Sequence, residues 1–310
     1  FKEYQIENNQ LGLSINNKQS NFLVEWDKKF KFFQLKFEFN KSLKESFISD
    51  YVQLSFLSES IKNIGIKLNA VKSIHSPSLN YILYRSAYKE YNWYNPNLKN
   101  QEVLSFSSEI SYKELIKLSG EYHSINNYTF FREQTNALTG EMDLFRKVIP
   151  NQIESEIKYL KIKLFSKLDL GKFSFINTGQ FQKKDQELLL DGLSTLNVPE
   201  WITRNTLMYS NSIFNNSLDI QTGLTFNYFT KFYADYYNPL LSDFVTQNYK
   251  EIGDYPRLDF FFNAKIQQTR VFIKVEHLNS SFTGYDYYSD IFNPYRDLSV
   301  RFGLVWNFFQ

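Results

Sequence analysis

The sequence contains no cysteine and very few of the residues from which enzymes commonly build active sites. Its 310 residues include three histidines, His75, His123 and His277, which lie far apart along the chain. The absence of Cys excludes disulfides and cysteine-ligated metal sites. No group of His, Asp and Glu has the spacing of metal ligands, and no nucleophile-elbow motif or phosphate-binding glycine loop is present. We therefore expect no catalytic residues, no metal and no cofactor, and predict that the protein is not an enzyme.

A large excess of either charge is also absent. Lys and Arg number 35 against 33 Asp and Glu, which leaves a formal net charge of +2. Nucleic-acid-binding proteins carry a clustered basic excess, so we expect no nucleic-acid partner. No stretch of the chain approaches the roughly 18 consecutive apolar residues that a membrane-spanning helix requires.

Aromatic residues, in contrast, are abundant. The chain has 31 Phe and 22 Tyr, and aromatic residues make up 18% of it, yet its mean hydropathy is only −0.42. This combination is typical of a membrane β-barrel, which has a lipid-facing apolar surface and an equally large polar interior. The alternative is a soluble all-β protein of one or two domains. Because no linker-like change of composition divides the chain, we predict a single domain over residues 1–310.

The C-terminal residues favour the membrane barrel. In the segment 300–308 every even position is large and apolar, and most of the alternate positions are polar or small. Side chains alternate between the two faces of a strand, so the even positions form one apolar face. A last strand that ends on aromatic residues is typical of the closing strand of an outer-membrane barrel. The side chains expected to form this C-terminal assembly signal are Phe302, Leu304, Trp306 and Phe308.

The same alternation recurs along the chain and predicts about 14–16 strands of an antiparallel up-and-down barrel. It is clearest at 33–39, 160–164, 218–228, 258–266 and 271–275. Before residue 150 the candidate strands lie near 9–16, 20–26, 29–40, 48–59, 62–73, 79–90, 101–111, 114–124 and 138–148. All seven prolines fall between candidate strands, where a missing backbone donor removes no ladder hydrogen bond.

The connections between the predicted strands alternate in length. Short links suited to tight turns occur at 169–171, 215–216 and 267–269. Long polar and aromatic segments occur near 183–201, 231–256 and 279–296. Short turns at one rim and long loops at the other are the barrel arrangement, with the turns on the periplasmic side.

The residues out of phase with the apolar face are expected to line the barrel lumen. The predicted lumen-lining residues are Lys161, Lys163, Asp219, Gln221, Asn227, Asp259, Asn263, Lys265, Arg270, Lys274, Glu276 and Arg301. Such a mixed-charge lining can pass small hydrophilic solutes, or it can fill a narrow lumen with interstrand ion pairs. A barrel enzyme would instead require His123 or His277 beside a serine and a polar orienting group. The aromatic clusters at 91–94 and 285–288 are interpreted as an interfacial girdle, with sugar stacking as the alternative.

Four segments of the C-terminal half carry a more specific resemblance. They are Pro256–Ile266, Glu276–Gly284, Pro294–Asp297 and Arg301–Phe309. These segments resemble the putative porin family of the Bacteroidota, which are Gram-negative bacteria. The resemblance is dense over 197–309 and thinner upstream. It implies a signal peptide, outer-membrane insertion by the barrel-assembly machinery and a pore, and it carries over no catalytic residues. Family members are usually longer, and the chain resembles chiefly their C-terminal half. Two alternatives stay open: the chain forms the barrel alone, or an N-terminal part supplies further strands.

The sequence thus predicts an outer-membrane, porin-like transport channel for passive diffusion of small hydrophilic solutes. The alternative is a non-conducting structural barrel that serves as a subunit of a larger outer-membrane protein complex. The expected partners are the lipid bilayer, the assembly machinery and, for the alternative, other outer-membrane proteins.

Overall fold

The fold is almost entirely β. The structure is a computed structural model that describes residues 2–8, 13–43, 47–58, 63–88, 90–134, 147–189, 192–282, 284 and 286–306. The described residues contain one helix, α1 (Leu79–Ile82), which has four residues. Among the described residues, none of the helical structure has the length and apolar character needed to cross a membrane.

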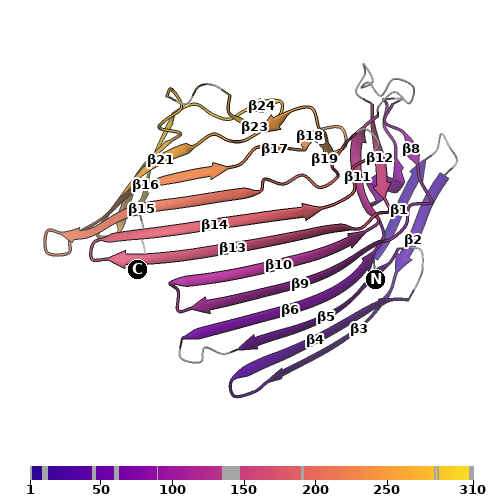
Figure 1. The fold of residues 1–310 in the computed structure, drawn as a ribbon, viewed down its shortest axis with the longest axis horizontal. Helices are drawn as coiled ribbons and strands as arrows, with labels where there is room; N and C mark the ends of the chain where they lie inside the picture. The colour runs from indigo at the N-terminus through magenta and orange to yellow at the C-terminus, as the bar shows by residue number, and fades with distance from the viewer. Residues whose placement is uncertain are drawn as a thin grey trace.

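A sheet of 13 strands runs through the molecule in the order β25-β22-β21-β16-β15-β14-β13-β10-β9-β6-β5-β4-β3. Figure 1 shows the strands from β21 to β3 side by side. Each strand is antiparallel to its neighbours, and all neighbours follow one another along the chain once the small strands of the loops are set aside. This is up-and-down topology. The strands are β3 (Asn21–Lys29), β4 (Phe33–Ser42), β5 (Ser49–Ser58), β6 (Ile64–His75), β9 (Gln101–Tyr112), β10 (Ile116–Asn126), β13 (Ile157–Leu170), β14 (Phe173–Asp185), β15 (Trp201–Ile213), β16 (Leu218–Phe229), β21 (Arg257–Ile266), β22 (Thr269–Glu276) and β25 (Ser299–Trp306).

The predicted all-β antiparallel fold is confirmed, whereas the sheet has fewer strands than the predicted 14–16. Strands β1 (Lys2–Asn8) and β2 (Leu13–Gln19) form a separate two-stranded sheet. The predicted strand at 79–90 is wrong, because α1 and the two-residue β7 (Leu83–Tyr84) occupy its first half. Tyr81 and Tyr84, three residues apart, both pack into the same hydrophobic core instead of alternating. Most of the predicted strand 138–148 lies outside the described residues.

The alternation of short and long connections is confirmed. Two to five residues join the strands at 30–32, 59–63, 113–115, 171–172, 214–217 and 267–268. Several of these turns contain residues in the left-handed backbone region, such as Gly171 (φ 61°), Asn215 (φ 52°) and Asn216 (φ 65°). Gly and Asn tolerate this region best, which explains why they mark these hairpins. The long connections leave the opposite end of the sheet.

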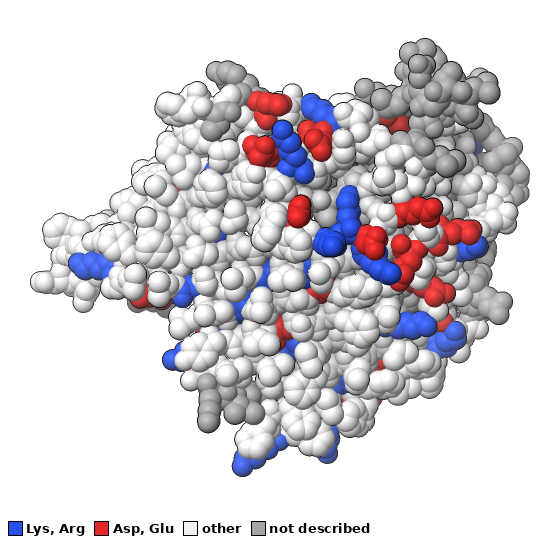
Figure 2. Space-filling model, viewed as in Figure 1, with Lys and Arg blue, Asp and Glu red and all other residues white. Residues whose placement is uncertain are grey.

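One face of the sheet is uncharged and mostly apolar over the middle of its strands. The strand register places Leu164, Leu118 and Ile110 on this face, together with Phe302, Leu304 and the rest of the predicted apolar series. Its charged residues stand at or near strand ends: Lys28, Lys41, Asp50, Lys72, Glu102, Lys158, Lys183 and Asp185. In the view of Figure 2, a wide uncharged surface covers the strands, and acidic and basic side chains gather toward the loops.

The long connections fold together into a second body, here called the loop layer, which comprises the described residues of 76–100, 127–156, 186–200, 230–256 and 277–298. Its core is built around Phe131, Val148, Leu241, Val245 and Ile291, each at most 2% exposed. The small elements of the loop layer are β8 (Trp93–Tyr94), β11 (Tyr128–Glu133), β12 (Val148–Ile153), β17 (Phe232–Tyr233), β18 (Tyr236–Asn238), β19 (Asp243–Thr246), β20 (Glu251–Ile252), β23 (Tyr288–Asp290) and β24 (Asn293–Pro294).

Polar contacts bind these connections to one another. The Tyr236 hydroxyl donates to Oε1 of Glu133 at 2.7 Å, and β11 pairs in parallel with β19. The ammonium of Lys250 lies 3.5 Å from the ring centroid of Tyr288 and donates to the Ile291 carbonyl at 3.0 Å. Most of the fully buried side chains among the described residues therefore lie in the loop layer, and Ile157, at the start of β13, lies at its border.

Candidate functional site

The polar face of the main sheet is the candidate functional site. The register places all twelve predicted residues on this one face: Lys161, Lys163, Asp219, Gln221, Asn227, Asp259, Asn263, Lys265, Arg270, Lys274, Glu276 and Arg301. Glu121 is opposite Lys161 on the neighbouring strand, and Lys274 is opposite Arg301. Because side chains alternate strictly along a strand, this face is continuous across all 13 strands.

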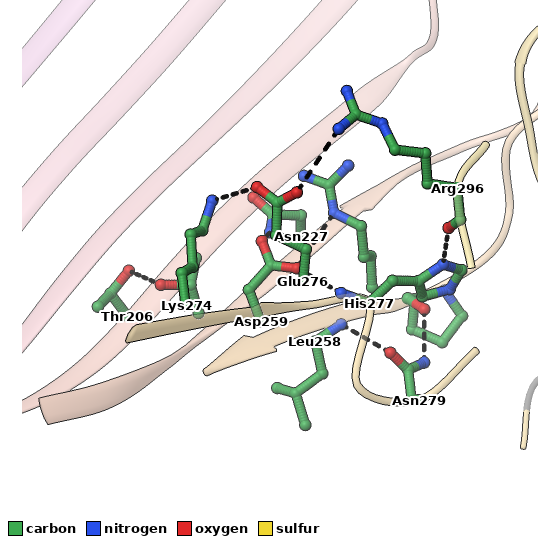
Figure 3. Close-up of polar contacts among 12 residues, drawn as sticks. Thr206, Asn227, Leu258, Asp259, Lys274, Glu276, His277, Asn279 and Arg296 are labelled. Atoms are coloured by element: carbon green, nitrogen blue, oxygen red, sulfur yellow. Dashed lines mark hydrogen bonds and ion pairs between the residues drawn. The ribbon is translucent and has the colours of Figure 1, made fainter. Parts of the chain in front are cut away.

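A network of ion pairs lies on this face at the point where β22 ends and the loop layer begins (Figure 3). The carboxylate of Glu276 accepts from Nζ of Lys274 at 2.7 Å and lies 3.0 Å from a guanidinium nitrogen of Arg301. A guanidinium nitrogen of Arg296 lies 4.0 Å away. Only 13% of the Glu276 side chain is exposed, so three cations surround one sheltered carboxylate.

A second carboxylate of this network, that of Asp259, organises the strand end. Its Oδ1 accepts from the backbone N–H of His277 at 2.9 Å and lies 3.7 Å from Nε of Arg257. Its Oδ2 accepts from the Asn227 amide at 3.5 Å. One side chain of β21 therefore contacts both β16 and the first residue of the loop layer after β22 (Figure 3).

His277 has a structural position. The residue is fully buried, and its Nδ1 donates to the Arg296 carbonyl at 2.8 Å. The imidazole packs edge-on against the rings of Tyr287 and Tyr295, with centroids 4.5 and 5.7 Å away. His277 thus fixes the long connection 277–298 to the sheet, and no serine hydroxyl contacts it among the described residues.

His123 comes closer to a catalytic arrangement. The Ser105 hydroxyl lies 2.8 Å from its Nδ1, and Oε2 of Glu121 lies 3.6 Å from its Nε2. Glu121 is held at 2.6 Å by Lys161. Ser105 lies in β9, an interior strand whose backbone N–H groups are engaged with β6 and β10, so the strand offers no donors for an oxyanion. We interpret this group as a polar-face hydrogen-bond network.

Two aromatic side chains on the polar face lie over glycines. Phe261 is opposite Gly223 and Phe272 is opposite Gly303 in the strand register. A Cβ added at Gly303 would lie 2.4 Å from the Phe272 ring, and one at Gly223 would lie 2.2 Å from the Leu207 carbonyl oxygen. The glycines therefore leave room for rings that lie flat on the sheet.

The loop layer contains a hollow of about 500 Å³ lined by aromatic, amide and acidic side chains. Among them are Tyr81, Tyr128, Asn197, Asp235 and Asp243. Burial raises the pKa of Asp235 to about 6, although the Asn197 amide and the Lys184 ammonium favour the ionised form. No group of three or more potential metal ligands occurs in the part of the chain that the structure describes.

Sequence reasoning missed several residues of the polar face. Lys117, Arg204 and Arg257 lie on it, and the alternation that identified their neighbours would have found them. Arg296 and Asp235 lie in loops, where no periodicity indicates a position. The cluster interpreted as a girdle at 91–94 instead contributes Tyr91 and Trp93 to the loop-layer core.

The residues of the predicted C-terminal signal are described in part. Phe302, Leu304 and Trp306 lie on the apolar face and are 82%, 63% and 56% exposed. Phe308 lies outside the described residues. The assembly role stays a prediction.

Comparison with known proteins identifies the family. A family model described as "Putative porin" matches residues 1–310. The chain belongs to this family. The match runs over the whole chain and not over the C-terminal segments alone, and the bacterial group stays a prediction. Membership in the porin family implies an outer-membrane location. No curated protein matches the chain.

Solved outer-membrane receptors share the fold of this porin-family chain. The ferric enterobactin receptor PfeA of Pseudomonas aeruginosa matches with a TM-score of 0.60 and 11% identity, over 86% of this chain and 40% of that one. The FrpB iron transporter of Neisseria meningitidis has a TM-score of 0.58 and 13% identity, over 93% and 46%. The siderophore receptor PirA of Acinetobacter baumannii has a TM-score of 0.54 and 13% identity, over 83% and 41%. The chain thus spans less than half the length of these proteins.

Proposed function

We propose that this porin-family chain forms an outer-membrane channel through which small hydrophilic solutes diffuse passively. The observation that carries the proposal is the division of the sheet into two faces. One face is uncharged along the middle of every strand and mostly apolar there, as a lipid-facing surface must be, although the amides of Asn177 and Asn205 lie opposite each other on it in β14 and β15. The other is polar and ionised across the whole sheet, as a water-filled passage requires.

In the proposed channel the polar-face residues, from Lys161 to Arg301, line the path of the solute. Their ion pairs run between neighbouring strands, for example Glu121 with Lys161 and Glu276 with Arg301. Such pairs stabilise the wall without crossing a lumen. The proposed partners are the lipid bilayer and, during biogenesis, the barrel-assembly machinery.

Closure of the barrel is a requirement of this proposal. Among the described residues, β3 and β25 are the edges of the main sheet, and each pairs on one side only. Every backbone polar group in a bilayer must be satisfied, so both edges need pairing partners in the membrane. The likeness to longer receptor chains, of which this chain covers less than half, supports that requirement.

Single-channel conductance of the purified protein in a planar lipid bilayer tests the proposal. Protein that shows the heat-shifted gel mobility of a folded barrel should give discrete steps that grow with salt concentration. Silence from such folded protein would contradict the channel and favour the alternative, a structural barrel subunit of a larger outer-membrane complex. Co-purification from outer membranes would then identify the complex.

A further inference from the structure

We propose that the channel prefers anions and that Lys265 and Arg270 form an anion-binding site near its short-turn end. This inference rests on the proposed channel and names the class of solute that it favours. The ligands are small solutes that bear phosphate or carboxylate groups. The evidence lies in how the charges of the chain are divided between the two faces of the sheet.

Basic side chains outnumber acidic ones on the polar face, although the whole chain is nearly balanced at 35 to 33. The basic residues that the register places there are Lys29, Lys36, Lys67, Lys117, Lys161, Lys163, Lys167, Lys184, Arg204, Arg257, Lys265, Arg270, Lys274 and Arg301. The acidic residues are Glu25, Asp27, Glu38, Glu109, Glu121, Asp169, Asp219, Asp259 and Glu276. The excess of basic over acidic residues is therefore specific to the polar face and does not follow from the composition of the whole chain.

Most of the acidic side chains are already engaged by a neighbour. Glu121, Glu109 and Glu276 form ion pairs with Lys161, Lys67 and Lys274 respectively. Five exposed cations, in contrast, have no acidic partner within 4 Å among the described residues: Lys117, Lys163, Arg204, Lys265 and Arg270. The charge that remains available to a passing solute is consequently positive.

Two of these cations face each other. Lys265 on β21 and Arg270 on β22 are register partners beside the 267–268 turn. Like charges directly opposite each other in a sheet are destabilising. Asp219, the other neighbour of Lys265, instead accepts from the Ser212 hydroxyl at 2.6 Å. The pair is therefore left with a repulsion that a bound anion would relieve.

The surroundings of the pair suit an anion. The two side chains border a hollow of about 760 Å³, whose polar lining includes the hydroxyl of Ser210 and the amides of Gln221 and Asn263. Guanidinium and ammonium groups with neutral N–H and O–H donors are the usual ligands of phosphate and carboxylate. Asp219 also borders the hollow, and its bond with Ser212 keeps one of its oxygens occupied.

The first test is the reversal potential of the protein under a potassium chloride gradient in a planar bilayer. Wild-type channels should favour chloride over potassium. The double variant Lys265→Gln/Arg270→Gln should shift the reversal potential toward potassium. The matched control, Lys72→Gln/Lys183→Gln, removes the same charge from the apolar-face side of the sheet and should leave the potential unchanged. Channels that favour potassium, or a double variant that matches wild type, would overturn the inference while leaving the channel intact.

The second test is independent of conduction. Isothermal titration of the folded, detergent-solubilised protein with pyrophosphate or citrate should show binding. Loss of either cation should weaken it by about tenfold or more, the expected effect of removing one charge-assisted hydrogen bond. Binding of one probe without the other would distinguish phosphate from carboxylate. Binding without conductance would reject the channel but keep the site, and absence of binding to both probes would reject the site.

Discussion

At the scale of single residues, Gly223 and Gly303 lie on the polar face in the middle of strands. Glycine is required at these positions because neighbouring atoms approach the backbone closely, and not because the chain turns there. Gly223 lies in the middle of β16, where a Cβ would meet the Leu207 carbonyl oxygen at 2.2 Å and the Phe261 ring at 2.9 Å. A backbone oxygen cannot move away as a flexible side chain can. We expect Gly223→Ala to destabilise the protein by about 1–3 kcal/mol through overpacking.

The matched control for this prediction is Gly179→Ala. Gly179 also lies inside a strand of the same sheet, but a Cβ there would have nothing within 4 Å. Urea titration of the heat-shifted, folded form measures both variants. Equal stability of the two would mean that the close approach at Gly223 does not constrain the sheet.

The acidic hollow of the loop layer gives a prediction about pH. The pKa of Asp235 is raised by burial from 3.8 to about 6, so the folded state binds this proton more tightly than the unfolded chain. The contribution of Asp235 therefore favours folding most at low pH and declines as pH rises from about 4 to about 6. We expect Asp235→Asn to stabilise the loop layer at pH 7 by about 1–2 kcal/mol, allowing for partial exposure.

Amide hydrogen exchange of loop-layer residues, compared at pH 5 and pH 7, measures this effect. Protection in wild type should decline at pH 7 after correction for the intrinsic exchange rate, and Asp235→Asn should remove the decline. Glu251→Gln removes an exposed carboxylate of the same layer and should keep it. A decline that survives in Asp235→Asn would assign the pH dependence to another group.

At the scale of elements, we expect the substitution of an arginine to have opposite effects on the two faces of a strand. Leu164 lies on the apolar face of the interior strand β13 and is 49% exposed. We expect Leu164→Arg to cost about 2–4 kcal/mol if the position lies near the bilayer midplane. Ser107→Arg places the same side chain on the polar face opposite Glu121 and should be tolerated. Folding titrations into lipid vesicles compare them, and the reverse order would mean that the apolar face is not the lipid face.

The long strands could be predicted from sequence because each depends on a local pattern of period two. From residue 157 onward, alternation predicts β13, β16, β21, β22 and β25, whereas β14 and β15 are bounded only by the predicted connections 169–171, 183–201 and 215–216. The prediction of a strand at 79–90 was wrong because Tyr81 and Tyr84 pack against a core formed by residues far away in sequence. A search for alternation within one segment cannot detect such contacts. The alternation predicts that the polar residues of the site share one face, but it does not predict which of them pair. The contact of Asp259 with Asn227, for example, depends on the register between two strands that are far apart in sequence.

At the scale of the whole molecule, insertion into the membrane gives a further prediction. Deletion of Phe308–Gln310 should impair outer-membrane assembly, because the closing strand would lose its terminal aromatic residues. Deletion of Gln310 alone is the control and should leave assembly unchanged. Heat-shifted mobility in outer-membrane fractions measures both, and normal assembly of the longer deletion would show that the aromatic terminus is dispensable.

The common core of the loop layer has a consequence for how the family can change over time. Outer loops of a barrel are usually free to vary one by one, because each contacts mainly water. Here Glu133, Tyr236 and Tyr288 come from three different connections, and each contributes to contacts between them. A change in one connection must therefore suit the others, and insertions should be confined to projecting points such as Phe282, which is 86% exposed. The loop layer should accordingly evolve as one unit, more like a small folded domain than like a set of independent loops.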